Sequence, residues 1–255
     1  MTGLIAAEWL KVRSVRSTFA VLGALVVALL IGTLMSYLMT ADWDGSVPAE
    51  QATFPGADPG MLAVPFAQFC LAAFGGLVIT SEFATGLIQT SVAAVPQRLR
   101  LLTAKIIVIA ALALATGLAI AFSSLLLSRL ITGDRPAPIT AWESVAAGLP
   151  TALASGLSIM VIGLVGLGIG AVVRSTAAAL VIVSTLLLVL PAMTTLLPSP
   201  WGGRISAVML PSLAGQLAGA QEDTVMSPYG ALAVMAAYVA AALGAGALSL
   251  LRRDV

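Results

Sequence analysis

The sequence contains no histidine and a single cysteine among its 255 residues. The lack of histidine excludes histidine-based zinc sites, H-E-x-x-H metalloproteases, serine–histidine relays and histidine-ligated haem. Cys70 alone cannot build a disulfide framework within the chain. We therefore expect neither a catalytic residue nor a metal site.

Charge is equally scarce, since only 9% of the residues are charged and 60% are hydrophobic. A water-soluble fold carries about 25% charged residues, because its surface must be solvated. This composition excludes a soluble enzyme, a nucleic-acid-binding protein and a disordered regulator. The formal net charge of +1 gives no reason to expect an acidic partner such as nucleic acid.

The few charges are clustered, and the gaps between the clusters are long and rich in Leu, Val, Ala and Ile. An α-helix needs about 20 apolar residues to cross a bilayer, and segments of alternating polarity that would indicate a barrel are missing. The gaps predict an all-α integral membrane protein, a single transmembrane domain over residues 1–255. Its six helices are expected at about 18–40, 61–81, 106–128, 150–172, 176–197 and 229–250.

The region between the last two spans, 198–228, is apolar but interrupted. Its charge-free part, Ile205 to Gln221, is too short for a regular span, and Pro211 breaks its middle. We interpret the region as an outer re-entrant or interfacial hairpin. The alternative is an ordinary apolar loop on the membrane surface.

Lysine and arginine in short loops predict the orientation. With a cytoplasmic N-terminus, nine of these residues lie inside and three lie outside. The inner set is Lys11, Arg13, Arg16, Arg98, Arg100, Lys105, Arg174, Arg252 and Arg253, and the outer set is Arg129, Arg135 and Arg204. Both termini are therefore expected inside.

No source of energy for transport is visible in the sequence. All six spans can be drawn without a charge in their middle, with Lys105 and Arg129 at the two ends of the third, whereas ion-coupled carriers usually place ionisable residues near the midplane. Neither Lys11 nor Lys105 lies in a phosphate-binding G-x-x-x-x-G-K-[ST] loop. ATP-driven transport would require a separate ATPase.

Two segments on the predicted inner side are amphipathic. In residues 4–16, Ile5, Trp9 and Val12 share one helical face, and Glu8, Lys11 and Arg13 lie elsewhere. The alternative role for this segment is a basic flank that only sets topology.

The second amphipathic segment, residues 81–100, joins spans two and three. Phe83, Leu87, Ser91 and Val95 form one row, and Pro96 ends the predicted helix. The alternative is a capped interfacial loop helix. Within the spans, Gly163, the pair Gly166 and Gly170, and the pair Ala240 and Gly244 fit a small-xxx-small spacing, although chance also explains it in so Ala- and Gly-rich a chain.

Two stretches resemble the permease subunits of the ABC-2 class of ABC transporters. They are "AEWLKVRSVRSTF" before the first span and "ITSEFATGLIQTSVAAVPQRLRLLTAK" between spans two and three, with an E-x-x-x-G element at Glu82 and Gly86. The six-span layout, inner termini and re-entrant region are similar too. The chain looks most like small bacterial permeases, and its Arg-over-Lys bias and Ala-rich spans are typical of an actinobacterial genome.

The resemblance implies that residues 82–95 form a coupling helix that docks on the ATPase subunit, and that residues 1–16 form a connecting helix. The implied ATPase interface is Glu82, Phe83, Thr85, Gly86, Leu87, Gln89 and Thr90, with Glu8, Trp9, Lys11 and Arg13 on the connecting helix.

It further implies a second permease copy or paired permease, ATP and Mg²⁺ bound by the ATPase, and export across the bacterial plasma membrane. The uncharged spans favour an amphiphilic or hydrophobic substrate. A non-transporting membrane scaffold and an ATP-independent channel or carrier stay open as alternatives.

Overall fold

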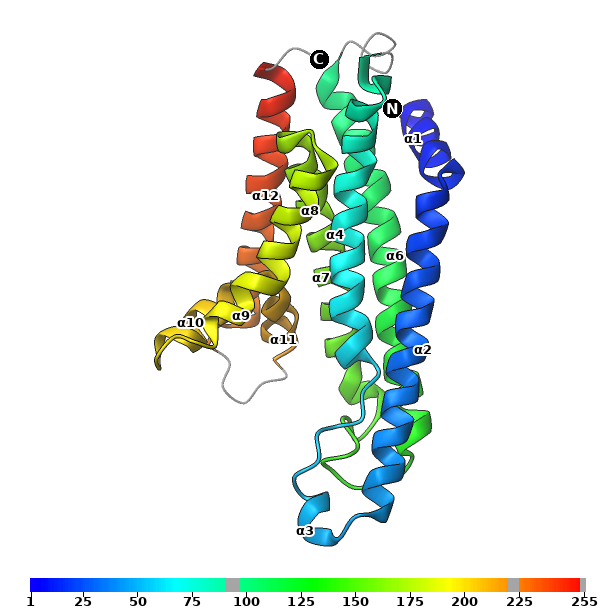
Figure 1. Ribbon diagram of the computed structural model, residues 1–255, viewed down its shortest axis with the longest axis vertical. Coiled ribbons are helices and arrows are strands. Elements are labelled where there is room, and N and C mark those ends of the chain that lie inside the picture. Colours follow the sequence, from blue (N-terminus) through cyan, green and yellow to red (C-terminus); the bar gives the residue numbers. More distant parts are fainter. Residues whose placement is uncertain (90–96, 220–224, 253–255) are drawn as a thin grey trace.

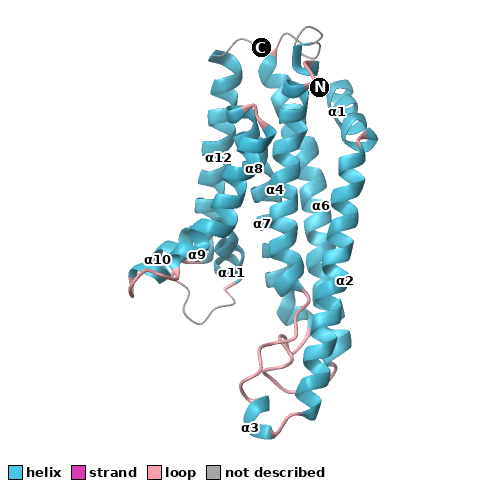
Figure 2. Ribbon diagram, in the orientation of Figure 1, coloured by secondary structure: helices cyan, strands magenta, loops and turns pink. Residues whose placement is uncertain are grey.

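The computed structural model describes residues 1–89, 97–219 and 225–252, and all regular secondary structure in these ranges is helical (Figure 2). The helices are α1 (Thr2–Ser14), α2 (Arg16–Gly45), α3 (Pro48–Gln51), α4 (Gly60–Ala84), α6 (Arg98–Thr132), α7 (Val145–Val173), α8 (Thr176–Ser184), a π-helix η1 (Thr185–Val189), α9 (Leu190–Thr194), α10 (Trp201–Val208), a 3₁₀-helix η2 (Leu210–Ser212), α11 (Leu213–Ala218) and α12 (Pro228–Arg252).

Six helical segments are long and apolar enough to cross a membrane, which confirms the predicted all-α membrane class. They are α2, α4, α6, α7, the run α8–η1–α9 and α12. Most extend past the predicted spans because a helix continues into polar flanks once its apolar part is formed. The fifth ends earlier than predicted, at Thr194 instead of residue 197. In Figure 1 the N-terminus and α1 lie at one end of the bundle, hereafter the α1 end, and α3 lies at the other, the α3 end.

Helix α7 lies at the centre of the bundle and packs against α4, α6 and α12. Small residues make this possible because they let two backbones approach closely. A Cβ built on Gly166 would lie 2.0 Å from the carbonyl oxygen of Ala72, and one on Gly75 would lie 2.2 Å from that of Gly163. A Cβ on Gly170 would lie 2.7 Å from the carbonyl oxygen of Gly76, so the predicted pair Gly166 and Gly170 is a packing feature. A Cβ on Gly244 would meet no atom within 4 Å.

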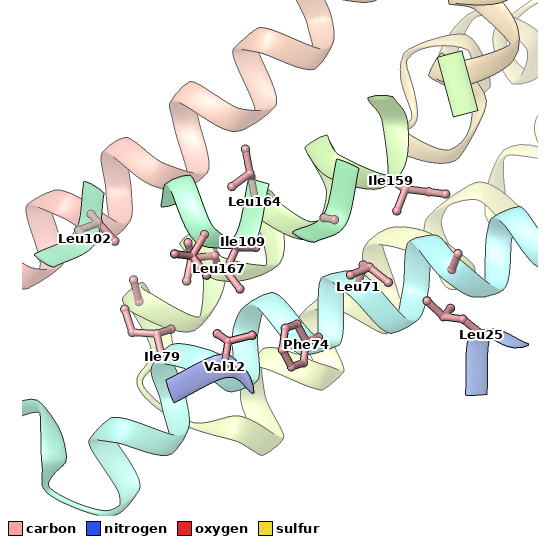
Figure 3. Packing of buried hydrophobic residues seen from close by; sticks show 14 of the residues in the cluster. Val12, Leu25, Leu71, Phe74, Ile79, Leu102, Ile109, Ile159, Leu164 and Leu167 are labelled. Atoms are coloured by element: carbon pink, nitrogen blue, oxygen red, sulfur yellow. The ribbon is translucent and has the colours of Figure 1, made fainter. Parts of the chain in front are cut away.

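The main apolar core joins α1 to α2, α4, α6, α7 and α12. Phe74 of α4, Ile109 of α6 and Leu167 of α7 lie in one cluster, to which α1 contributes Val12 (Figure 3). Each of these four side chains is at most 5% exposed. Helix α1 is therefore part of the packed structure and not a free flank.

The fifth span changes its helical pitch before Pro191. The N–H of Leu190 bonds to the carbonyl of Thr185, five residues back, which makes one π-helical turn. Because proline crowds the carbonyl four residues before it and lacks an N–H, a wider turn at this place relieves the conflict. After α9, the short helices α10 and α11 lie short of the α3 end that α2 and α6 reach (Figure 1).

At the α3 end, the loops before α4 and after α6 form a small packed cap. The carbonyl oxygen of Ala57 accepts hydrogen bonds from Ser36 Oγ of α2 at 3.0 Å and Ser128 Oγ of α6 at 2.8 Å. Its N–H donates to the carbonyl of Ile139 at 2.8 Å. One buried residue, Ala57, therefore connects α2, the α2–α4 loop, α6 and the α6–α7 loop.

Candidate functional site

The candidate site is a cluster of four charged side chains at the α1 end, drawn from three helices. Glu8 and Lys11 come from α1, Glu82 from the last turn of α4, and Lys105 from the second turn of α6. Glu8 and Lys11 are three residues apart, so a helix presents both on the same side. Val12 of that side packs into the core, which turns the two charges toward α4 and α6.

The four groups form a continuous network. Lys105 Nζ donates to Glu8 Oε2 and to Glu82 Oε1, each at 2.6 Å. Lys11 Nζ donates to Glu8 Oε1 at 2.7 Å and to Glu82 Oε1 at 3.0 Å. Each lysine thus bridges the same two carboxylates, and the two positive and two negative charges balance.

Because three of its four side chains are buried, the network contributes strongly to the stability of the fold. The side chain of Lys105 is 1% exposed, that of Glu8 2% and that of Glu82 8%, while that of Lys11 is 42% exposed. Removing one partner of a buried ion pair costs about 3–5 kcal/mol, because the charge that stays behind has lost its compensation. The network therefore fixes α1 against α4 and α6 as long as all four members are present.

Among the described residues, Lys11 has a shifted pKa, and Glu82 has an oxygen without a hydrogen bond. Burial lowers the pKa of the Lys11 ammonium, but its hydrogen bonds to Glu8 and Glu82 more than offset this effect and raise that pKa above its ordinary value. Glu82 accepts both lysine bonds on Oε1, and its Oε2 is buried without a hydrogen-bond partner in the described structure. A buried carboxylate oxygen without a hydrogen bond costs folding free energy, so Oε2 is a potential acceptor for a further donor.

Arg98 at the start of α6 and Arg174 at the end of α7 both bond to the end of α12, at the same end of the bundle. Arg98 Nη1 donates to the carbonyl of Leu250 at 2.8 Å, and Arg174 Nη2 donates to that of Ser249 at 3.0 Å. The last carbonyls of a helix have no partner within it, so these arginines satisfy the end of α12. The Arg174 guanidinium also lies 4.8 Å from the centre of the Phe83 ring.

The helix predicted over residues 82–95 begins differently in the structure. Glu82 and Phe83 belong to α4, which continues to Ala84, and Gly86 has a φ of +72°, which ends that helix. Helical structure resumes at residues 87–89, so Leu87 and Gln89 follow the break. The prediction placed the break too early because the cap-like Ser81 lies inside a helix.

The remaining residues of that prediction divide between the turn and the part outside the described residues. Thr85 lies in the turn after α4, and its Oγ1 donates to the carbonyl of Ser81 at 2.8 Å. Thr90 and the rest of the predicted coupling helix, 91–95, lie outside the described residues. Of the predicted coupling-helix residues that the structure describes, Glu82 alone joins the charged network, together with Glu8 and Lys11 of the predicted connecting helix.

The predicted apolar face of residues 4–16 was wrong in one respect. The buried side of α1 carries Val12, as expected, but also Glu8, while Trp9 is 45% exposed and Arg13 is exposed. Helical spacing alone assigned Glu8 to the polar side because it could not foresee a buried lysine opposite. The sequence places Lys105 at the end of the third span and does not predict its place in the charged network. The sequence did hold a sign of this pairing, because Lys11 and Lys105 are its only lysines and both fall on the predicted side that also holds Glu8 and Glu82.

A pocket of about 280 Å³ lies beside the network, between the α1–α2 junction and α4. Its polar rim includes Glu8, Lys11 and Glu82, and its apolar wall includes Phe74 and Leu77. Among the described residues, no three His, Cys, Asp or Glu side chains gather as metal ligands would. The site can therefore bridge helices and offer paired charges to a ligand.

No protein-family model matches the chain, and no curated protein matches it. Evidence for a function therefore comes from the charged network, its helices and the adjoining pocket.

Proposed function

We propose that this chain is the permease subunit of an ABC-2-class transporter in the bacterial plasma membrane, driven by a separate ATPase subunit that binds ATP and Mg²⁺. The observation that carries the proposal is the buried network that joins α1, the end of α4 and the start of α6. The network contains Glu82, the first residue of the segment 82–95 that the resemblance identifies as the ATPase-docking element.

The network suits the transmission of force. A push applied to the segment after α4 would reach Glu82 first, and through two lysines it would reach α1 and α6 without a flexible joint. Transmission of this kind needs rigid elements with discrete arrangements. Leu87, at 54% exposed, and Trp9, at 45%, give the same end apolar side chains that a partner subunit could cover.

The other parts of the proposal follow from the six spans. Helices α2, α8–α9 and α12 are the least buried, at 17–22% of their most apolar windows, which leaves their surfaces for lipid or a second permease copy. The N-terminus would face the cytoplasm, and α10 to α11 would form the outer re-entrant region. Export of an amphiphilic or hydrophobic compound fits spans whose buried Lys105 is already neutralised by Glu8 and Glu82.

Reconstitution tests the proposal. The chain and the ATPase that copurifies with it are placed in liposomes, and ATP hydrolysis and ATP-dependent movement of a lipophilic dye are measured together. We expect Glu82→Gln to retain ATPase binding but to lower the dye moved per ATP, because the network loses charge balance. Arg135→Gln, at the α3 end, is the matched control and should behave as the unmodified chain.

Two results would overturn the proposal. Dye movement by the purified chain without any ATPase would favour an ATP-independent channel or carrier. Failure of every ATPase to bind, with no movement under any condition, would favour a membrane scaffold.

A further inference from the structure

We propose that the pocket beside the charged network binds one phospholipid with a zwitterionic head that ends in a primary ammonium, such as phosphatidylethanolamine. The head would lie at the polar rim formed by Lys11 and Glu82, and one acyl chain would lie on the wall formed by Phe74, Leu77 and Val78.

The position of the pocket suits a lipid. Its lining on α4 extends from Phe74 to Glu82, a distance of about 12 Å along a helix at 1.5 Å per residue. Facing this stretch are residues 14–18, where α1 ends and the first span begins. The pocket therefore runs from charged groups into the apolar part of the bundle, which is the order of groups in a phospholipid.

The charges of the rim select the head. A purely anionic head would meet Lys11 but also the carboxylates of Glu8 and Glu82, which line the same pocket. A zwitterion offers its phosphate to Lys11, whose side chain is 42% exposed, and its ammonium to a carboxylate. The four charges of the network sum to zero, so a head of zero net charge keeps the site balanced.

Glu82 supplies the second, independent indication of a ligand. The residue is 6% exposed, it lines the pocket, and its Oε2 has no hydrogen-bond partner in the part of the chain that the structure describes. A primary ammonium has three N–H donors, and one of them would bond to Oε2 once the carboxylate turned this oxygen toward the pocket. The quaternary ammonium of phosphatidylcholine has no donor and could not satisfy this oxygen.

The size of the pocket limits what it holds. A volume of about 280 Å³ is at the lower end for small-molecule pockets. It accommodates a head and the upper part of one chain, and the second chain would stay in the bilayer. A lipid so placed would contact both the α1–α2 junction and α4.

Native mass spectrometry of the delipidated chain in detergent tests the proposal by titration with phosphatidylethanolamine, phosphatidylcholine and phosphatidylglycerol of equal chain length. We expect one phosphatidylethanolamine to bind about tenfold more tightly than either other lipid, the difference made by one hydrogen bond to a charged group. Ethanolamine phosphate, which lacks chains, is the arm for a free solute and should not bind measurably.

Leu77→Trp and its control, Leu153→Trp, test the apolar wall without removing any charge. Leu77→Trp fills the apolar wall and should abolish the preference for phosphatidylethanolamine. Leu153→Trp, on the exposed side of α7 at 53% exposed, is the matched control and should keep that preference. Lys11→Gln should weaken phosphatidylethanolamine binding, whereas Arg13→Gln on the same helix should not.

The proposal is overturned if phosphatidylglycerol or phosphatidylcholine binds as tightly as phosphatidylethanolamine, if Leu77→Trp keeps the preference, or if ethanolamine phosphate binds alone. None of these measurements involves an ATPase, so they stand apart from the test of transport.

Discussion

Lys105→Met should expose the energetic role of the charged network most directly. Methionine keeps an unbranched side chain of similar length, but the variant leaves Glu8 and Glu82 with Lys11 as their one cation in the network, and thus one uncompensated buried negative charge. Loss of one partner from a buried pair predicts a decrease of about 3–5 kcal/mol in the free energy of unfolding. Arg100→Met, on the exposed side of the same helix, should cost at most about 1 kcal/mol.

A double variant separates the network from a general loss of packing. In Lys105→Met with Glu82→Gln, the remaining Glu8 and Lys11 are again balanced and stay bonded at 2.7 Å. The combined loss should therefore be smaller than the sum of the two single losses by about 0.5–3 kcal/mol. The free energies are measured by unfolding in detergent micelles, followed through helix content. Additive losses, or a loss for Lys105→Met no larger than that of Arg100→Met, would refute the reasoning.

Three further predictions concern other parts of the molecule. Burial raises the pKa of Asp58, so its ionised form is disfavoured in the folded state, and stability is lost as the pH rises from 3.8 through the raised value. The Asp58→Asn variant keeps an Oδ1 that can accept from the Gly60 N–H, and its melting temperature should exceed that of the unmodified chain increasingly over this pH window and then level off. A constant difference between the two melting temperatures would contradict this. Gly166→Ala should destabilise the bundle by about 1–3 kcal/mol or more in the same micelle unfolding assay, because its Cβ meets a backbone oxygen. Gly244→Ala should be neutral or slightly stabilising, because its Cβ meets no atom within 4 Å. Equal effects of the two variants would refute the packing argument. In a cysteine-free background, a membrane-impermeant thiol reagent should label Asp42→Cys, at an exposed position, from outside the cell and the likewise exposed Arg100→Cys only after lysis. The reverse pattern would overturn the proposed orientation.

The spans could be predicted from the sequence because a membrane imposes a simple condition, a long apolar helix, that composition alone reveals. The charged network could not be predicted in the same way. Glu8 and Lys105 are 97 residues apart, and the chain has to fold before either carboxylate or ammonium meets its partner. Helical spacing describes one element at a time, so it treated Glu8 as a solvated group and Lys105 as an anchor at the membrane surface.

The start of the predicted coupling helix was missed for a different reason. Ser81, Glu82 and Thr85 have the composition of a helix beginning, but in the structure they continue α4. Caps stabilise helix ends by satisfying free N–H groups, and those groups are already bonded when a helix continues through the site. The better local signal was Gly86, whose positive φ few other residues tolerate.

The junction at Ala57 has a consequence for how the bundle can change shape. Serines of α2 and α6 donate hydrogen bonds to its carbonyl oxygen at the α3 end. At the other end, Glu8, Glu82 and Lys105 join α4 and α6 to α1, which leads directly into α2. Helices joined at both ends cannot slide past one another without breaking the hydrogen bonds at one end. Any large rearrangement would then have α2, α4 and α6 swing as a single block, with α7 as the pivot against which α8 to α12 are displaced.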